Sequence, residues 1–204
     1  MDKTPFGPAS LRAWDDRPYT PGYLPGLDAP DQAQIVTFRL ADSLPRHVVA
    51  QIRQERLRLP QNDPRCAAAD KWLDAGHGDC TLADPANAQI IRDVLYRDAG
   101  RLYTLMAWVI MPNHVHAILT PFAAEPLWSI IETWKSVSAH RIQRRRGCHG
   151  TLWQRSYVGR VIRSPKHLAQ AVLYIEHNPV KAGLALAAHD WPWSSAHEDL
   201  LLTG

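Results

Sequence analysis

The chain has 204 residues, of which 46% are hydrophobic and 21% are charged, and its formal net charge is +3. This balance predicts one folded domain with a sizeable core and excludes fibrous and wholly disordered chains. No apolar run approaches the roughly 20 residues of a membrane helix, and the first residues lack an apolar signal core. We therefore expect a cytoplasmic protein with no membrane partner. Three widely spaced cysteines without a CxxC pair predict reduced thiols and fit no usual zinc pattern.

The positive charge is concentrated in one part of the chain. Residues 101–163 contain nine Lys or Arg against two Glu, a local charge of +7, which leaves −4 for the rest. Such asymmetry indicates an anionic partner, of which nucleic acid is the commonest, although basic stretches also occur as plain solvated surfaces.

The first half of the chain predicts an arm, a strand and three helices. Residues 1–31 are rich in Pro and Gly and predict an extended arm. Residues 34–40 (QIVTFRL) are rich in β-branched side chains and predict a strand. Helix start and stop signals then predict helices over 46–59, 64–74 and 84–98, the last with Asp84 as its N-cap.

The second half predicts a hairpin followed by helices. Two apolar runs, 102–110 and 114–120, joined by Met-Pro-Asn, predict two largely buried strands. Apolar residues at three- and four-residue steps predict a long helix over 125–146, and Pro165 begins a last helix to about residue 177. Residues 152–161 are mixed, a strand or an irregular segment. The alternation predicts an α+β fold with helices packed on one antiparallel sheet.

Two histidines and a tyrosine are candidates for chemistry. His114 and His116 are one residue apart in a predicted strand, so both imidazoles emerge on the same face and can bind one divalent cation. Tyr174 and Asn178 are four residues apart on the last helix, so their side chains are neighbours. Taken singly, the histidines also fit a half-exposed strand, Tyr174 an amphipathic rim position and Asn178 a helix cap.

Several strings occur together in one order along nearly the whole chain. They are PGYLP at 21–25, VTFRL at 36–40, MPNHVH at 111–116, LWQ at 152–154, YIEHNPVKAGL at 174–184 and DWPWSS at 190–195. In these strings the chain resembles the REP-associated tyrosine transposases, which belong with the single-tyrosine HUH transposases. Their order and co-occurrence are far more specific than an isolated HxH or a lone tyrosine.

The resemblance implies a ferredoxin-like α+β domain whose antiparallel sheet carries the HUH pair on a central strand and whose tyrosine lies on a C-terminal helix. It implies that His114 and His116 bind the metal and that Tyr174 is the nucleophile. Asn178 occupies the place of a further polar metal ligand, where insertion-sequence relatives usually have glutamine. We accordingly expect a catalytic domain over 32–185 with a helical insertion at about 60–100, preceded by the arm and followed by a tail, 186–204, that packs on it.

The activity implied is that of a metal-dependent single-strand DNA endonuclease and strand transferase. It would use Mg²⁺ or Mn²⁺ and form a 5′-phosphotyrosine at hairpin or repetitive palindromic DNA, as a monomer or a homodimer. No GxxxxGK[ST] phosphate loop is present, and the reaction needs no nucleotide cofactor. The candidate DNA-binding residues are Lys135, Arg141, Arg144, Arg145, Arg146, Trp153, Gln154, Arg155, Arg160 and Arg163.

Two other functions fit the same residues. One is a domesticated hairpin-DNA-binding protein with little or no turnover, which would keep the basic surface but need no metal. The other is a water-using metal hydrolase built on the HxH pair, which would leave free 5′-phosphate ends and make Tyr174 dispensable. A protein–DNA adduct distinguishes the transesterase from both.

Overall fold

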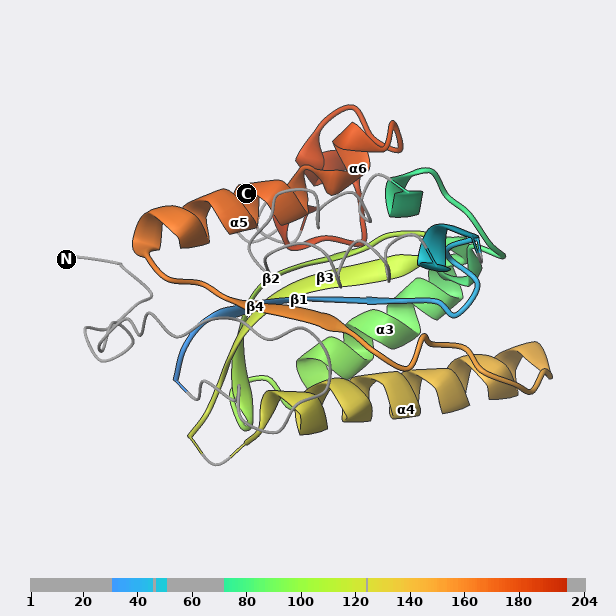
Figure 1. The fold of residues 1–204 in the computed structure, drawn as a ribbon, viewed down its shortest axis with the longest axis horizontal. Coiled ribbons are helices and arrows are strands. Elements are labelled where there is room, and N and C mark those ends of the chain that lie inside the picture. The colour runs from blue at the N-terminus through green and yellow to red at the C-terminus, as the bar shows by residue number, and fades with distance from the viewer. Residues whose placement is uncertain (1–30, 46, 51–71, 124, 198–204) are drawn as a thin grey trace.

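Figure 1 shows the fold in a computed structural model, with one sheet lying between two layers of helices. The structure describes residues 31–45, 47–50, 72–123 and 125–197. The expected arm and most of the helices expected over 46–59 and 64–74 lie outside the described residues. The strands are β1 (Gln34–Arg39), β2 (Tyr103–Ile110), β3 (His114–Pro121) and β4 (Val158–Val161), in the sheet order β2-β3-β1-β4.

The connections between these strands define the topology. Helix α3 (Pro85–Arg97) joins β1 to β2, and helix α4 (Leu127–Arg146) joins β3 to β4. All neighbouring strands are antiparallel, and β3 lies between β1 and β2. This β-α-β-β-α-β order is the ferredoxin-like arrangement, which confirms the α+β class. Helix α3 is the first crossover helix, although it falls within the region expected as a helical insertion.

Local sequence signals set the helix ends. Asp84 Oδ1 accepts a hydrogen bond from the N–H of Ala86 at the start of α3. Helix α4 ends at Gly147, whose φ of 63° is the left-handed conformation that glycine adopts without strain. Helix α5 (Pro165–Glu176) begins with Ser164 Oγ accepting from the N–H of His167, and the short helix α6 (Asn178–Lys181) follows it. No helix of the described chain has the length and apolar character to cross a bilayer.

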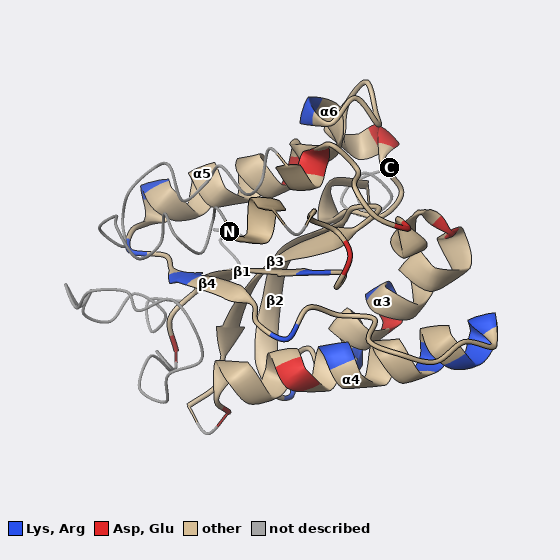
Figure 2. Ribbon diagram, turned by 45° about the vertical axis from the view of Figure 1, so that its right-hand side comes forward, with Lys and Arg blue, Asp and Glu red and all other residues tan. Residues whose placement is uncertain are grey.

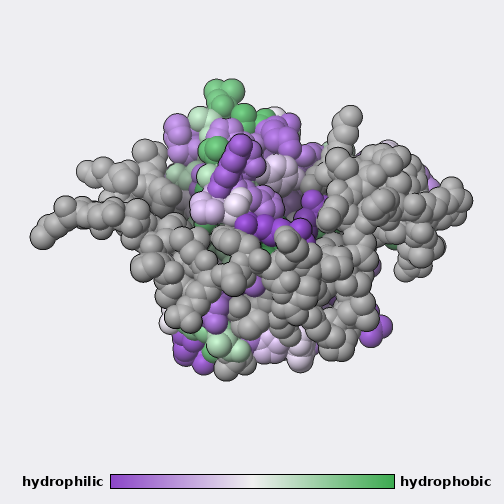
Figure 3. Space-filling view, turned by 60° about the vertical axis from the view of Figure 1, so that its left-hand side comes forward, coloured by the Kyte–Doolittle hydropathy of each residue, from purple (hydrophilic) through white to green (hydrophobic). Residues whose placement is uncertain are grey.

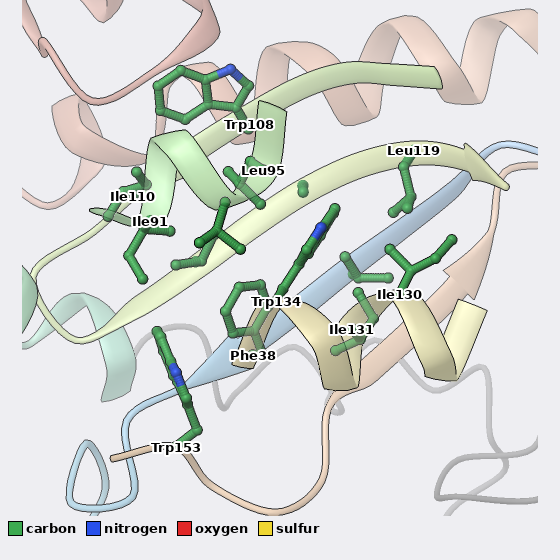
Figure 4. Packing of buried hydrophobic residues seen from close by; sticks show 14 of the residues in the cluster. Phe38, Ile91, Leu95, Trp108, Ile110, Leu119, Ile130, Ile131, Trp134 and Trp153 are labelled. Carbon is green, nitrogen blue, oxygen red and sulfur yellow. The ribbon is translucent and has the colours of Figure 1, made fainter. Parts of the chain in front are cut away.

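The main core fills the space between the sheet and the helices α3 and α4. Alternate residues of β1 and β3, such as Phe38 and Val115, face these helices, and Trp134 and Ile131 of α4 pack against them (Figure 4). Trp153 lies in the same core, with its ring centroid 4.9 Å from that of Phe38. Since both faces of the central strands are covered, nearly all residues of β3 are buried.

A second, smaller core lies on the opposite face of the sheet, under α5. Ala171 and Ile175 of α5 pack against Val109 of β2 and Ile118 of β3. Figure 1 shows α5 on the side of the sheet away from α3 and α4. The residues of β3 that alternate with the main core therefore face α5, and His114 and His116 are among them.

The chain after α6 returns to the edge of β2. The 3₁₀ turn η4 (Ala188–Asp190) leads to Trp191, whose Nε1 donates to the carbonyl of Ile110 at 3.0 Å. The N–H of Ile110 in turn donates to the carbonyl of Trp193 at 2.8 Å. Ser195 Oγ accepts from the N–H of Trp108 at 3.1 Å and lies 3.0 Å from Glu176 Oε1. This tail thus ties β2 to the C-terminal end of α5.

We expect Ser195→Ala to lower the free energy of unfolding by about 1–3 kcal/mol, because the buried N–H of Trp108 loses its acceptor. Urea denaturation followed by circular dichroism measures the change. Ser156→Ala is the matched control, since Ser156 is exposed and should tolerate the same change. Equal stability of the two variants would show that the hydrogen bonds of Ser195 do not stabilise the fold.

Candidate active site

His114 and His116 lie side by side on β3, beneath α5. Their ring centroids are 4.7 Å apart, and the side chains are 0% and 1% exposed. Strand alternation explains the pairing, because residues two apart project to the same face of a sheet. Ile118, two residues further on, belongs to the apolar core of that face. The site is therefore a polar patch within an otherwise apolar layer.

The Nδ1 atom of each histidine already has a partner. Asn113 donates through Nδ2 to the carbonyls of Leu73 and His77, at 3.2 and 3.0 Å. Carbonyls only accept, so the Oδ1 of Asn113 faces His114, where it lies 2.7 Å from Nδ1. His114 must then donate from Nδ1 and keep its lone pair on Nε2, which is the arrangement that metal-binding histidines have. The Nδ1 of His116 lies 2.7 Å from Thr37 Oγ1.

Burial keeps His114 neutral. Complete burial lowers the pKa of His114 well below its ordinary value of 6.5, and the neighbouring His116 lowers it further. A neutral imidazole is the form that binds metal. The Nε2 of His114 is buried and has no hydrogen-bond partner in the described part of the chain. Such an atom costs stability unless a ligand uses it.

Tyr174 lies directly over this pair. Its ring meets His116 edge-on, with centroids 5.9 Å apart and an interplanar angle of 71°. The Tyr174 side chain is half-buried, so solvent reaches its ring. Lys181 Nζ lies 4.7 Å from the centroid of the same ring, which brings a cation to the nucleophile candidate.

Asn178 follows Tyr174 by four residues and is completely buried. Neither its Oδ1 nor its Nδ2 has a hydrogen-bond partner within the described residues. A simple capping role predicts a bonded amide, so the cap interpretation does not account for this side chain. Helix α5 starts near Ala33, at the end of the sheet where β3 finishes, and therefore runs back along β3. One turn after Tyr174, Asn178 comes to the His114 end of the pair.

Two imidazoles and an amide are the donor set that the described residues offer for a metal. No third His, Cys, Asp or Glu joins the two histidines in that part of the chain. Cys80 and Cys148 are free thiols, and burial raises the pKa of Cys80, which disfavours the thiolate that zinc requires. The orphaned atoms of His114 and Asn178 fit a divalent cation with open positions for other ligands.

The arginines of α4 lie on the other side of the sheet. Arg141, Arg145 and Arg146 form ion pairs with Asp93, Asp84 and Asp79, at 3.3, 2.7 and 2.8 Å. Hydrogen bonds from Arg145 and Arg146 hold the pKa values of Asp84 and Asp79 below their usual range. Arg144 is exposed near the end of the same helix. The three paired arginines join α4 to the region of α3, and the structure brings none of these four arginines to the histidines.

The remaining candidate DNA-binding residues occupy three places. Trp153 is buried in the main core, where its Nε1 donates to Ser138 Oγ at 2.9 Å. Lys135 Nζ donates to the carbonyl of Arg155, and partial burial lowers the pKa of Lys135. The residues at or near the β4 edge of the sheet are Gln154, which is half-buried, and Arg155, Arg160 and Arg163, which are exposed.

Three residues of the site escaped the sequence analysis. Asn113 was part of the hairpin turn, Thr37 part of a strand, and Lys181 part of a matching string. The signal for Asn113 was a polar side chain directly before a buried strand. Thr37 carried no such signal, because its pairing with His116 depends on the register of two strands far apart in sequence.

Comparison with known proteins finds relatives in sequence and in fold. A family model described as "Transposase IS200 like" matches residues 87–178. The REP-associated tyrosine transposase of Escherichia coli (strain K12) is 32% identical over 114 residues, covering 55% of this chain and 66% of that protein. A curated relative from Haemophilus influenzae is 28% identical over 108 residues, covering 48% and 61%. The chain thus spans slightly less than two thirds of the length of these relatives.

A solved structure shares the fold. It is described as a REP-associated tyrosine transposase bound to a REP hairpin, and it superposes with a TM-score of 0.56 at 22% identity. The superposition covers 90% of this chain and 84% of the other. By sequence the chain is thus similar to the IS200-like transposases over residues 87–178, and it shares the fold of this solved structure.

Proposed function

We propose that this chain cleaves and rejoins single-stranded DNA by transesterification, with Tyr174 as the nucleophile. The observation that carries the proposal is the contact between the Tyr174 ring and His116, 5.9 Å between centroids, beside the orphaned Nε2 of His114. Packing alone does not explain why the phenol of Tyr174 lies against a histidine pair that can bind a metal. The contact lies within one chain, and we therefore propose that Tyr174 acts on the metal site of its own chain.

His114, His116 and Asn178 would hold the divalent cation, for which we propose Mg²⁺ or Mn²⁺. Bound there, the cation supplies a Lewis acid that draws charge from the nonbridging oxygens of the scissile phosphate. Asn113 and Thr37 orient the imidazoles through Nδ1. Lys181, whose Nζ lies 4.7 Å from the centroid of the Tyr174 ring, would add positive charge beside the scissile phosphate.

The proposed reaction conserves the number of phosphodiester bonds. Tyr174 Oη attacks phosphorus and forms a phosphotyrosine, while the bond from phosphorus to the 3′-oxygen breaks. The phenol proton passes to solvent, which reaches the half-buried ring, and the leaving oxygen takes up a proton to become a free 3′-hydroxyl. Attack of a 3′-hydroxyl on the 5′-phosphotyrosine then rejoins a strand. The substrate we propose is hairpin-forming DNA near repeated palindromes.

We expect Tyr174→Phe to abolish the covalent protein–DNA adduct, because the nucleophilic oxygen is gone, while DNA binding survives. Labelled hairpin DNA incubated with Mn²⁺ and resolved on a denaturing gel shows the adduct as a protein-linked band. Chelation of the metal with EDTA should remove the band from the wild-type protein as well.

Tyr96→Phe is the control for this experiment, since Tyr96 lies on α3 on the far side of the sheet and should leave the adduct intact. Binding without any adduct would favour a DNA-binding protein without turnover. Cleavage by Tyr174→Phe that leaves free 5′-phosphates would favour the hydrolase.

We expect Asn178→Leu to separate metal binding from stability. Loss of the amide oxygen should weaken Mn²⁺ binding by at least about tenfold to a hundredfold, the range seen even for groups that only orient metal ligands. The metal-free variant should be as stable as the wild type or more so, because two orphaned amide atoms no longer cost folding energy. Titration calorimetry and urea denaturation measure the two effects.

Asn87→Leu is the matched control. Asn87 is also buried, but its amide is bonded, donating to the carbonyl of Thr81 at 2.8 Å and accepting from Arg145 at 3.0 Å. This variant should lose about 1–3 kcal/mol of stability and bind Mn²⁺ normally. If Asn178→Leu behaves like the control in both measurements, Asn178 is structural and not a ligand.

A further inference from the structure

Cations gather in two separate places, on opposite faces of the sheet. The segment 133–175 contains no Asp or Glu. In Figure 2 most of its basic residues lie either at the end of α4 or where β4 leads into α5, and a few lie between these two places. The α4 group faces the acids of α3 and of the turn before it, as described above. The second group includes Arg160 and Lys166, which form no ion pair with any described residue and are exposed.

Strand pairing places Arg160 on the face of the histidines. Arg160 is directly opposite Ile35 of β1, and Ile35 is opposite Ile118 of β3. Residues paired in this way project to the same face, and Ile118 and Ile35 pack on the α5 side. Two strand spacings and two residues separate Arg160 from His116, a distance of about 12 Å between their Cα atoms.

Lys166 lies in the same direction from the site. It is in the first turn of α5, eight residues before Tyr174, or about 12 Å along the helix axis. The β4–α5 connection joins it to Arg160, and both lie toward the end of the sheet where β3 finishes. In Figure 3, which turns this side forward, the described surface visible between the grey atoms is mostly hydrophilic.

Helix α5 leaves part of this face without a helical cover from the described chain. It packs over β2 and β3, whereas Thr37 of β1 and Val158 of β4 are partly exposed. A strand of DNA leaving Tyr174 over β1 and β4 would thus meet Arg160 and Lys166. At a stacked spacing of about 3.4 Å per nucleotide, about 12 Å corresponds to three or four nucleotides, and to fewer in a stretched strand.

We propose that Arg160 and Lys166 bind backbone phosphates of the single strand that flanks the cleaved bond, a few nucleotides from Tyr174. The arginines of α4, including Arg144, do not contact the DNA. This inference rests on the proposed function for its substrate, and it divides the basic residues into a DNA-binding set and a structural set.

The test measures the salt dependence of DNA binding in the Tyr174→Phe background, where no cleavage occurs. The probe is a fluorescent oligonucleotide with one hairpin and a single-stranded flank on either side, followed by anisotropy over a range of KCl concentrations. Removing one cation that binds a phosphate of a single strand lowers the slope of log Kd against log salt by about 0.7. We expect that decrease for Arg160→Gln and for Lys166→Gln, and about twice that for the double variant.

Arg144→Gln is the matched control, because Arg144 is exposed and forms no ion pair with a described residue, yet lies on α4. It should leave the slope unchanged. Arg145→Gln should also leave it unchanged while lowering the melting temperature, since Arg145 pairs with Asp84. A decrease for Arg144→Gln equal to that for Arg160→Gln would overturn the assignment to one face.

Trimming the oligonucleotide locates the phosphates that are bound. When the flank that binds Arg160 and Lys166 is removed, the Tyr174→Phe protein should show the same lower slope as the double variant. The slope of the double variant should be the same with and without that flank. A difference between the two proteins that persists without either flank would place the bound phosphates on the hairpin and overturn the proposal. Absence of DNA binding would overturn it too.

This measurement is independent of the chemistry. If the wild-type protein makes no adduct but the slopes change as expected, the transesterase proposal fails and the binding surface stands. If the adduct forms and the slopes of Arg160→Gln and Lys166→Gln equal that of the parent, only the inference about the surface fails.

Discussion

The imidazoles of His114 and His116 and the side-chain amide of Asn178 are buried in an apolar layer. Their burial constrains the whole side of the sheet that faces α5. Polar atoms removed from water lower stability unless they are hydrogen-bonded. Asn113 and Thr37 provide hydrogen-bond partners for the Nδ1 atoms of His114 and His116. The Nε2 of His114 and the amide of Asn178 remain without such compensation from the described chain. Folding tolerates this loss of stability where a ligand uses the atoms, which is why the cluster indicates a site and not core packing.

Side chains alternate along a strand, so the two faces of the sheet carry different residues and have different roles. Val115 and its alternating neighbours close the large core against α3 and α4, and the histidines between them face α5. The same division separates the cations. On the α4 side, arginines neutralise acids of neighbouring elements, whereas Arg160 remains on the side of Tyr174. Net charge alone therefore overstates how many cations a nucleic acid can reach.

The position of Tyr174 depends on residues of the smaller core and of the C-terminal tail. Ile175 anchors α5 in the smaller core, and Ser195 of the tail bridges Glu176 to the backbone of Trp108. Tyr174 directly precedes these two anchored residues, on a helix of 12 residues that is held at both its buried face and its end. These contacts within the chain hold Tyr174 in its position relative to His116.

Local pattern determined most of the elements of this protein. Periodicity, caps and proline positions predicted β1 to β3 and α3 to α5 to within a few residues, and the spacing of His114 and His116 was sufficient to put them on one face. Only the tertiary structure decided that Tyr174 meets His116, that Asn178 is buried with a bare amide, that Trp153 lies in the core, and that Arg145 pairs with Asp84. These contacts depend on packing and on strand register, which bring together residues distant in sequence. A local sequence pattern contains neither kind of information.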